Sequence, residues 1–188
     1  MELQGKRAAV LIEQMYQELE VWYPVYRLRE AGCKVTLVGP EAGQSYASKL
    51  GYPAKSDKAA KDVSADDFDI LIIPGGYAPD HMRRCEPMIR LTSTMAEQGK
   101  VVAAICHGPW TIIDAGFAKG RRMTSYPSIK TDLKNAGANW VDEEVVVDNG
   151  LVTSRKPADL PAFNRKLIEE IGEGVHQAGR VPQRAMAE

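Results

Sequence analysis

The fold is decided by the stretch Val101-Val-Ala-Ala-Ile-Cys106-His107-Gly108-Pro109, in which a short apolar run ends on a cysteine and a sharp turn. The run has the length and composition of a buried parallel strand, and Gly108-Pro109 forces a turn directly after it. Pro109 is suited to the first position of a helix. Cys106 therefore lies on a predicted strand-to-helix bend, which is the layout of a nucleophile elbow.

Cys106 is the candidate nucleophile of this chain. A helix N-terminus and the neighbouring imidazole of His107 both favour the thiolate, which is the reactive form of cysteine. His107 is the candidate general base, or the cation that lowers the pKa of the thiol. The alternative is a core cysteine that only follows a strand, since free cysteines are among the most buried residues. The turn after Cys106 favours the nucleophile.

Apolar strands and helical segments alternate on both sides of this stretch. Strands are predicted at residues 8–12, 34–39, 69–73 and 101–105, and helices at residues 17–31, 86–98, 124–135 and 158–171. Almost wholly apolar strands that alternate with helices predict a parallel sheet covered on both faces. Hairpins are expected near residues 46–56 and at residues 145–153, where Asp148-Asn149-Gly150 joins two strands.

The first predicted helix carries two apolar stripes, which imply that its neighbours cover much of its surface. The stripes are Leu19, Trp22, Tyr23 and Tyr26 on one side and Val21, Val25 and Leu28 on the other. Pro24 disfavours a regular helix here, because an interior proline costs ~3 kcal/mol. We therefore expect Glu20 in a bend that points inward. Its carboxyl group there is either protonated, so that it donates to a thiolate, or paired with a base.

Three loops follow the carboxyl ends of predicted strands, at residues 13–20, 74–80 and 106–109. Ligands of open parallel sheets bind beyond these ends, so the loops are expected to converge on one crevice. Pro74-Gly75-Gly76 can bring a backbone N–H close to the Cys106 sulfur. Together with the His107 N–H it would form an oxyanion hole; a flexible turn is the alternative.

Composition limits the class of protein. A chain of 188 residues suits one domain, and a formal net charge of −1 offers no basic surface for nucleic acid or membranes. No signal peptide or membrane-spanning stretch is recognisable, so the cytoplasm is the expected location. The three cysteines match no metal-ligand spacing, and Cys33 and Cys85 are expected to serve packing. His81 is assigned to a surface loop and His176 to a C-terminal tail.

Five motifs along the chain carry a resemblance to a known family. They are Glu18-Leu19-Glu20 before Pro24, Pro74-Gly75-Gly76, Ile105-Cys106-His107-Gly108-Pro109, Thr124-Ser125-Tyr126-Pro127, and Val152-Thr-Ser-Arg155 before Pro157-Ala158-Asp159. Over about residues 6–172 the chain resembles the ThiJ/PfpI superfamily. Its PfpI-like intracellular cysteine protease branch is more similar than the branch of the parkinsonism-associated deglycase. The resemblance implies a flavodoxin-like three-layer α/β/α sandwich with a mainly parallel central sheet and a nucleophile elbow. It would form one PfpI-like domain at residues 1–172, followed by a tail at 173–188.

The resemblance also implies roles for individual residues. Glu20 would be hydrogen-bonded to Cys106, while the N–H groups of Gly76 and His107 would hold an oxyanion, with Gly75 and Tyr126 beside the substrate. In the PfpI-like branch an acidic residue of a neighbouring subunit pairs with the histidine. The matching position is Asp80, one methylene shorter than the glutamate expected there. The branch forms dimers that assemble into hexamers.

The histidines limit which related activity fits. Tyr126 stands where the deglycase branch carries a histidine, so His107 is the only imidazole expected at the site. The resemblance implies that glutamine amidotransfer would need a distant histidine late in the chain, as in the related amidotransferases. No histidine lies between Tyr126 and the tail, so this activity is rejected.

Two functions remain, and both use Cys106. The first is a stress-response cysteine hydrolase or lyase that acts on peptides, or on small dicarbonyls and their adducts, without cofactor or metal. The alternative is a redox-sensing or chaperone-like stress protein with the same reactive thiol. A flavin or nucleotide binder is disfavoured, because Glu13-Gln-Met-Tyr follows the first strand in place of a glycine-rich loop. The expected partners are a small carbonyl compound or peptide and further copies of the chain, with no nucleic acid and no membrane.

Overall fold

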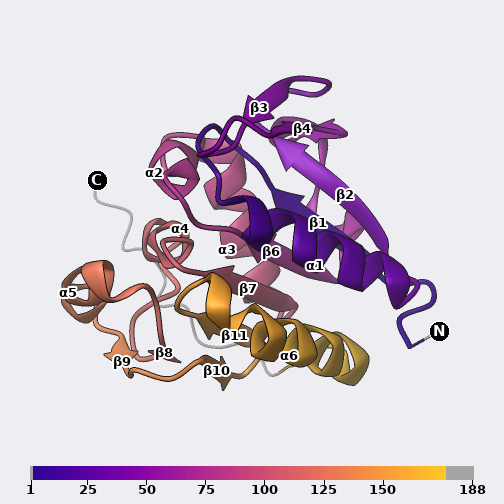
Figure 1. Ribbon diagram of the computed structural model, residues 1–188. Coiled ribbons are helices and arrows are strands. Elements are labelled where there is room, and N and C mark those ends of the chain that lie inside the picture. Colours follow the sequence, from indigo (N-terminus) through magenta and orange to yellow (C-terminus); the bar gives the residue numbers. More distant parts are fainter. Residues whose placement is uncertain (1, 177–188) are drawn as a thin grey trace, which may run out of the picture.

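A seven-stranded sheet lies at the centre of the computed structural model, which describes residues 2–176 (Figure 1). Its order is β10-β11-β7-β6-β1-β2-β5, and all neighbours are parallel except β10 and β11. The strands are β1 (Arg7–Leu11), β2 (Lys34–Gly39), β5 (Lys58–Ala59), β6 (Ile70–Ile73), β7 (Val101–Ile105), β10 (Val145–Asp148) and β11 (Leu151–Ser154). The five longest parallel strands run in the order 2-1-3-4-5 of a flavodoxin-like fold, as predicted.

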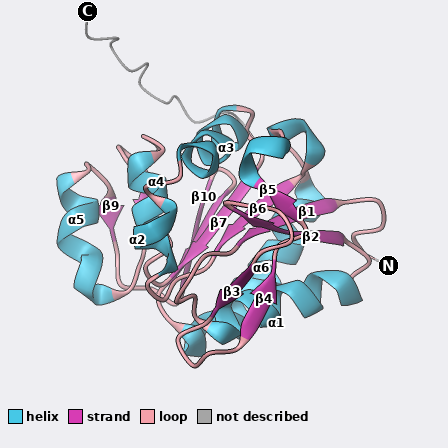
Figure 2. Ribbon diagram, turned by 90° about the horizontal axis from the view of Figure 1, so that it is seen from above, coloured by secondary structure: helices cyan, strands magenta, loops and turns pink. Residues whose placement is uncertain are grey.

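Helices cover both faces of this sheet (Figure 2). α1 (Glu18–Glu30) and α6 (Leu160–Glu173) pack on one face. The other face carries α2 (Ala78–Met82), α3 (Glu86–Glu97) and α4 (Pro109–Asp114), with α5 (Lys130–Asn135) beside α4. β6 and β7 are buried along their whole length, because both of their faces are covered. The three-layer α/β/α sandwich is confirmed.

Short elements complete the fold. β3 (Ser45–Ala47) and β4 (Pro53–Lys55) form the predicted hairpin, while β8 (Arg122–Met123) and β9 (Asn139–Trp140) form a small parallel pair. Single 3₁₀ turns lie at Ala60–Asp62, Ala65–Asp67, Pro127–Ile129 and Pro157–Asp159. The sequence prediction missed β5, β8, β9 and α2, because two to five residues are too few to show a periodic pattern.

The predicted bend around Glu20 is wrong. α1 runs without interruption from Glu18 to Glu30 with Pro24 inside it. The helix is capped by Gln17, whose side chain accepts a hydrogen bond from the Glu20 N–H at 2.9 Å. Pro24 only removes the N–H that would have bonded to the carbonyl of Glu20 four residues before it. Glu20 therefore points inward from the regular first turn of a helix, and it is fully buried.

The prediction that neighbouring elements cover both apolar stripes of α1 is confirmed for one stripe only. Val21, Val25 and Leu28 are buried against the sheet, whereas Leu19 and Tyr26 are 55% and 59% exposed. The helix is thus covered on one side in the single chain. Its open side forms, together with Leu50 and Tyr52 of the β3–β4 hairpin, an apolar groove of about 550 Å³.

The last described residues extend slightly past the predicted domain. α6 ends at Glu173, two residues beyond the predicted helix end, and residues 174–176 continue from it. The rest of the tail predicted at 173–188 lies outside the described residues. Among residues 2–176, no helix is long and apolar enough to cross a membrane.

Candidate active site

The three loops predicted to converge meet at the carboxyl ends of the strands. Tyr16 forms an antiparallel bridge with Gly76, and the Gln17 N–H donates to the Gly75 carbonyl at 3.3 Å. The loop after β7 completes a cavity of about 420 Å³. Its walls are Gln17, Glu20, Lys49, Gly76, Tyr77, Cys106, His107, Tyr126 and Pro157.

Cys106 occupies a strained bend between β7 and α4. Its φ is +63°, a left-handed conformation that few residues other than glycine adopt. Two backbone hydrogen bonds hold it there: its N–H donates to the Ser154 carbonyl at 3.0 Å, and its carbonyl accepts from the Tyr126 N–H at 2.9 Å. The predicted strand-to-helix elbow is therefore present. The side chain faces the cavity, although the residue is only 7% exposed.

Gly75 allows the catalytic candidates to approach one another. A Cβ at this position would lie 2.6 Å from the Cβ of Cys106 and 2.7 Å from Oε2 of Glu20. It would also lie 2.9 Å from the backbone nitrogen of His107, so no larger residue fits without displacing all three groups. The Gly75 N–H itself donates to Glu20 Oε2 at 2.7 Å. The loop predicted to carry oxyanion donors thus also holds the carboxyl group.

Burial controls the charge state of the Glu20–Cys106 pair. It raises the pKa of Glu20 to about 7, although the Gly75 N–H and the Cys106 thiol both lower it. Burial and the Glu20 carboxylate raise the pKa of Cys106 to about 12, against the lowering effect of the Gly76 and His107 N–H groups. The expected lowering of the thiol pKa by the helix end is therefore outweighed. Over the range between these two values the pair holds one proton and one negative charge, and the thiolate is the form with the proton on Glu20.

Oε1 is the oxygen of Glu20 that stays available for a proton, since Oε2 already accepts from Gly75. Oε1 is buried and has no hydrogen-bond partner among the described residues. The carboxyl group as a whole interacts with the Cys106 thiol.

His107 lies between the nucleophile and a residue that the sequence did not reveal. Its Nδ1 is 3.2 Å from the Cys106 sulfur, and its Nε2 is 3.1 Å from the hydroxyl oxygen of Ser128. The ring stacks on Tyr126 with centroids 5.1 Å apart. Burial, followed by the charge of Lys49, lowers the pKa of His107, which favours the neutral imidazole. A neutral ring at this distance can accept a proton from the thiol or the substrate.

The comparison with protein families identifies the family of this chain. Residues 6–170 match the model of the DJ-1/PfpI family. The chain belongs to this family. The predicted resemblance is thereby confirmed, and Cys106, Glu20 and His107 lie in the region that matches.

Individual relatives of the DJ-1/PfpI family cover most of the chain. YraA of Bacillus subtilis, whose name proposes a cysteine protease, is 46% identical over 87% of this chain and 97% of its own length. Deglycase PfpI of Pyrococcus furiosus is 43% identical over 82% of this chain and 92% of its own. Among solved structures, DJ-1beta of Drosophila melanogaster superposes with a TM-score of 0.84 at 32% identity, covering 89% of this chain and 90% of that one.

Asp80 is not brought to His107 within a single chain of this DJ-1/PfpI protein. It is exposed in the first turn of α2, and among the described residues its carboxylate makes no hydrogen bond or ion pair. The Nε2 atom that an acidic partner would need faces Ser128 instead. The role of Asp80 across a subunit contact stays a prediction.

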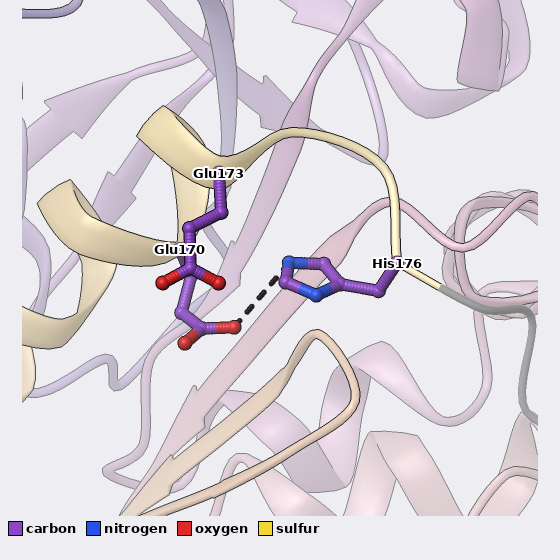
Figure 3. A group of neighbouring side chains, drawn as sticks. All are labelled: Glu170, Glu173 and His176. Carbon is purple, nitrogen blue, oxygen red and sulfur yellow. Dashed lines mark ion pairs between the residues drawn. The ribbon is translucent and has the colours of Figure 1, made fainter.

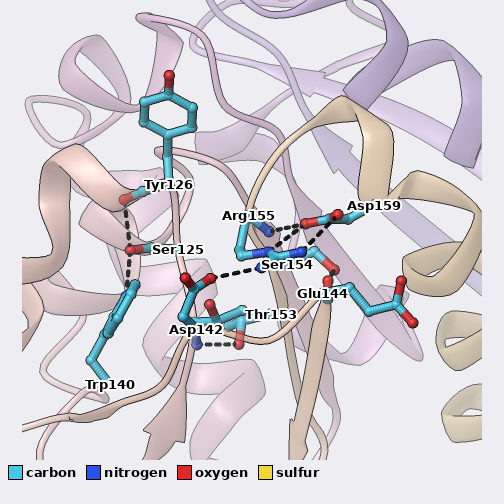
Figure 4. A network of polar contacts seen from close by, with 10 residues as sticks. Ser125, Tyr126, Trp140, Asp142, Glu144, Thr153, Ser154, Arg155 and Asp159 are labelled. Atoms are coloured by element: carbon cyan, nitrogen blue, oxygen red, sulfur yellow. Dashed lines mark hydrogen bonds and ion pairs between the residues drawn. The ribbon is translucent and has the colours of Figure 1, made fainter.

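A polar network supports the far wall of the site (Figure 4). The Trp140 indole donates to Ser125 Oγ at 3.0 Å, which in turn donates to the Tyr126 carbonyl at 3.0 Å. On the neighbouring strand the Ser154 hydroxyl donates to the Glu144 carbonyl at 2.6 Å. These bonds fix Tyr126 and Ser154, the two residues whose backbones hold Cys106.

Proposed function

We propose that this protein is a stress-response enzyme that uses Cys106 to transform small dicarbonyl compounds and their adducts, with peptides as the wider substrate class. The observation that carries the proposal is the strained Cys106, whose sulfur lies 3.2 Å from the His107 imidazole at the wall of a cavity of about 420 Å³. A cavity of this size suits a small carbonyl compound better than a folded chain. The names of the relatives, a deglycase and a proposed cysteine protease, support the same chemistry.

The first step is addition of the sulfur to the carbonyl carbon. Proton transfer from Cys106 to Glu20 yields the thiolate, which forms a C–S bond to the aldehyde carbon of a dicarbonyl such as methylglyoxal. The π electrons of the C=O bond move to oxygen, where the N–H groups of Gly76 and His107 stabilise the charge. The oxygen then takes the proton of Glu20, and a hemithioacetal results.

The second step moves hydrogen between the two carbons. Neutral His107 removes the proton from the former aldehyde carbon, and the ketone oxygen takes up a proton, which gives an enediol. The proton on His107 then passes to the carbon that was the ketone, while the hydroxyl group on the sulfur-bearing carbon loses its proton and becomes the thioester carbonyl; the two oxygens exchange one proton in all. One carbon is oxidised and the other reduced, so no external oxidant is consumed. The product is a thioester of lactate on Cys106. Water hydrolyses the thioester, which releases lactate and restores the thiol.

The test is consumption of methylglyoxal by the purified protein and its Cys106→Ala variant. We expect the parent to produce lactate and the variant to lose about 10³-fold or more in kcat/KM, because the nucleophile is gone. A Cys33→Ala variant is the matched control, since Cys33 is buried away from the cavity. Equal rates for the parent and Cys106→Ala would refute the proposal.

A second candidate function, redox sensing, is favoured by the unpartnered Oε1 of Glu20. A protonated carboxyl group beside the sulfur can donate a hydrogen bond to an oxidised cysteine and so stabilise the oxidised form. No turnover of methylglyoxal or peptides, with Cys106 oxidised by dilute peroxide before Cys33 and Cys85, would select this function. Mass spectrometry of the peroxide-treated protein identifies the residue that is oxidised first.

The protein is also proposed to form a homo-oligomer, a dimer or a hexamer, in the cytoplasm. The exposed apolar residues Leu19, Tyr26 and Leu50 support a second copy on that side of α1. In such an assembly, Asp80 of a neighbouring copy would approach His107. Light scattering of the purified protein gives the molar mass that tests this point.

A further inference from the structure

A second group of side chains lies at the opposite end of the sheet from Cys106. Glu170 and Glu173 lie in the last turn of α6, and His176 follows three residues later (Figure 3). One donor atom from each of the three lies within 4.8 Å of the others. The loops that receive His176 precede β7 and β11, so the group lies beyond the amino ends of these strands. The proposed function uses none of these residues.

The ring of His176 is held in place by backbone contacts. The backbone N–H of His176 donates to the Gly99 carbonyl at 2.8 Å. The ring packs against Gly150, where a Cβ would lie 2.8 Å from its Cδ2 atom. Gly150 also has a φ of +77°, so the turn both requires glycine and leaves room for the imidazole. His176 was assigned to the tail from sequence, whereas its side chain is only 15% exposed.

His176 and Glu170 are close enough for an ion pair when the imidazole is protonated, but they form no hydrogen bond (Figure 3). Nε2 of His176 lies 3.3 Å from Oε2 of Glu170. Nε2 is nevertheless buried and without a hydrogen-bond partner among the described residues. The Glu170 side chain is only 8% exposed. Among the described residues its carboxylate accepts no hydrogen bond, and its ion-pair partner is this ring. A buried carboxylate that accepts no hydrogen bond is costly, and a bound cation would stabilise its charge.

The separation of these atoms is the one expected for two ligands of the same metal. Zinc binds imidazole nitrogen and carboxylate oxygen at about 2.0–2.1 Å in a tetrahedron, which places neighbouring donor atoms about 3.3–3.4 Å apart. Ligands of one ion direct their lone pairs at the ion and not at each other. The close approach of Nε2 and Oε2 without a hydrogen bond fits that arrangement.

We propose that Glu170, Glu173 and His176 bind one divalent transition-metal cation, of which zinc is the best match. Glu170 and His176 are preformed ligands, and exposed Glu173 supplies the third by rotation of its side chain. The mixed nitrogen and oxygen donors favour zinc over magnesium or calcium, which prefer oxygen alone. A water molecule would complete the tetrahedron. The cation would link α6 to the turns before β7 and β11, so its role is structural.

The test uses the full chain with Cys106→Ala, so that the reactive thiol does not compete for the metal. Zinc is titrated by calorimetry, and the imidazole signals are followed by NMR. We expect one equivalent to bind and the His176 signals to shift. Glu170→Gln and His176→Ala should each lower the affinity about 10-fold or more. His81→Ala, in α2, is the matched histidine control and should bind as the parent does.

A variant at an exposed ligand separates an effect on metal binding from an effect on folding. Glu173 is exposed, so Glu173→Gln should fold normally and still weaken zinc binding. Cobalt in place of zinc should give a tetrahedral visible spectrum without a sulfur charge-transfer band. Unchanged His176 signals on addition of zinc would overturn the proposal. So would equal affinity of all the variants, which would assign binding to other groups such as Cys33 or Cys85.

Discussion

The two ends of the central sheet carry side-chain groups that differ in how clearly the sequence reveals them. At the carboxyl end, Cys106 needs a left-handed backbone, and Gly75 makes room for it. Such a site leaves visible marks in the sequence, because the close approach requires glycine at position 75 and Gly108-Pro109 marks the sharp turn. At the amino end, Glu170 and Glu173 lie on an ordinary helix, where they resemble any solvated charged face. A strained site can be recognised from sequence, whereas a site built on regular backbone cannot.

The largest effect is expected from Glu20→Gln at the carboxyl end. The variant cannot accept the thiol proton, so kcat/KM for methylglyoxal should fall about 10²- to 10³-fold. In the parent, kcat/KM should rise with pH through about 7, because the Glu20–Cys106 pair must lose one proton before a thiolate can form. The variant should lack this inflection. The measurement is the pH dependence of kcat/KM, and Glu18→Gln, two residues away on α1, is the control. An inflection near 7 retained in Glu20→Gln would assign it to another group.

The same variant should change how stability depends on pH. The pKa of Glu20 is about 7 in the folded protein and 4.5 as its ordinary value, so the native state holds the proton more tightly. Its contribution is complete below pH 4.5 and is lost as the pH rises to about 7. The loss is up to about 3 kcal/mol. Urea unfolding at pH 5 and pH 8 should show this loss in the parent and not in Glu20→Gln. Parallel changes in both proteins would contradict the prediction.

Glu20 also shows how far the sequence could predict the site. Its inward direction and its nearness to Cys106 were predicted correctly. The bend was not, because one missing hydrogen bond at Pro24 costs less than the burial of Val21, Val25 and Leu28 gains. The direction of the thiol pKa was also wrong. A helix end and an imidazole can be seen in a sequence, whereas the depth of burial that outweighs them requires the packed structure.

Other features of the structure could not be predicted from the sequence, for a different reason. Ser128 contacts His107 across 21 residues, through side-chain orientations that no local pattern specifies. Lys49 faces the same cavity from the end of a hairpin, where a lysine is unremarkable. The exposed apolar stripe of α1 was predicted to be covered, because apolar periodicity does not distinguish a face that is buried in the chain from one that is exposed in it.

A smaller effect, on stability alone, is expected from Gly150→Ala at the amino end. An alanine there adopts a φ of +77° and brings its Cβ within 2.8 Å of the His176 ring. We expect a loss of about 1–2 kcal/mol in the free energy of unfolding. Turnover of methylglyoxal should be unchanged, since the cavity lies at the other end. Gly172→Ala is the matched control, because nothing lies within 4 Å of its added Cβ and alanine favours α6. A fall in turnover for Gly150→Ala would mean that the two ends are coupled.

The smallest effect is expected from Ser128→Ala, which tests what positions His107. Loss of the hydrogen bond to Nε2 should lower kcat about 2- to 10-fold and leave KM unchanged, since a single such bond contributes about 0.5–1.5 kcal/mol. Ser128→Thr keeps the hydroxyl group and should retain most of the rate. Asp80→Ala provides the comparison, because the neighbouring subunit's carboxylate would have to reach the same nitrogen. If Asp80→Ala lowers kcat and Ser128→Ala does not, the imidazole is oriented across the subunit contact and the hydroxyl group only fills space. If Ser128→Ala alone lowers kcat, each chain holds a complete site, and the shorter Asp80 reflects the transfer of this task to Ser128.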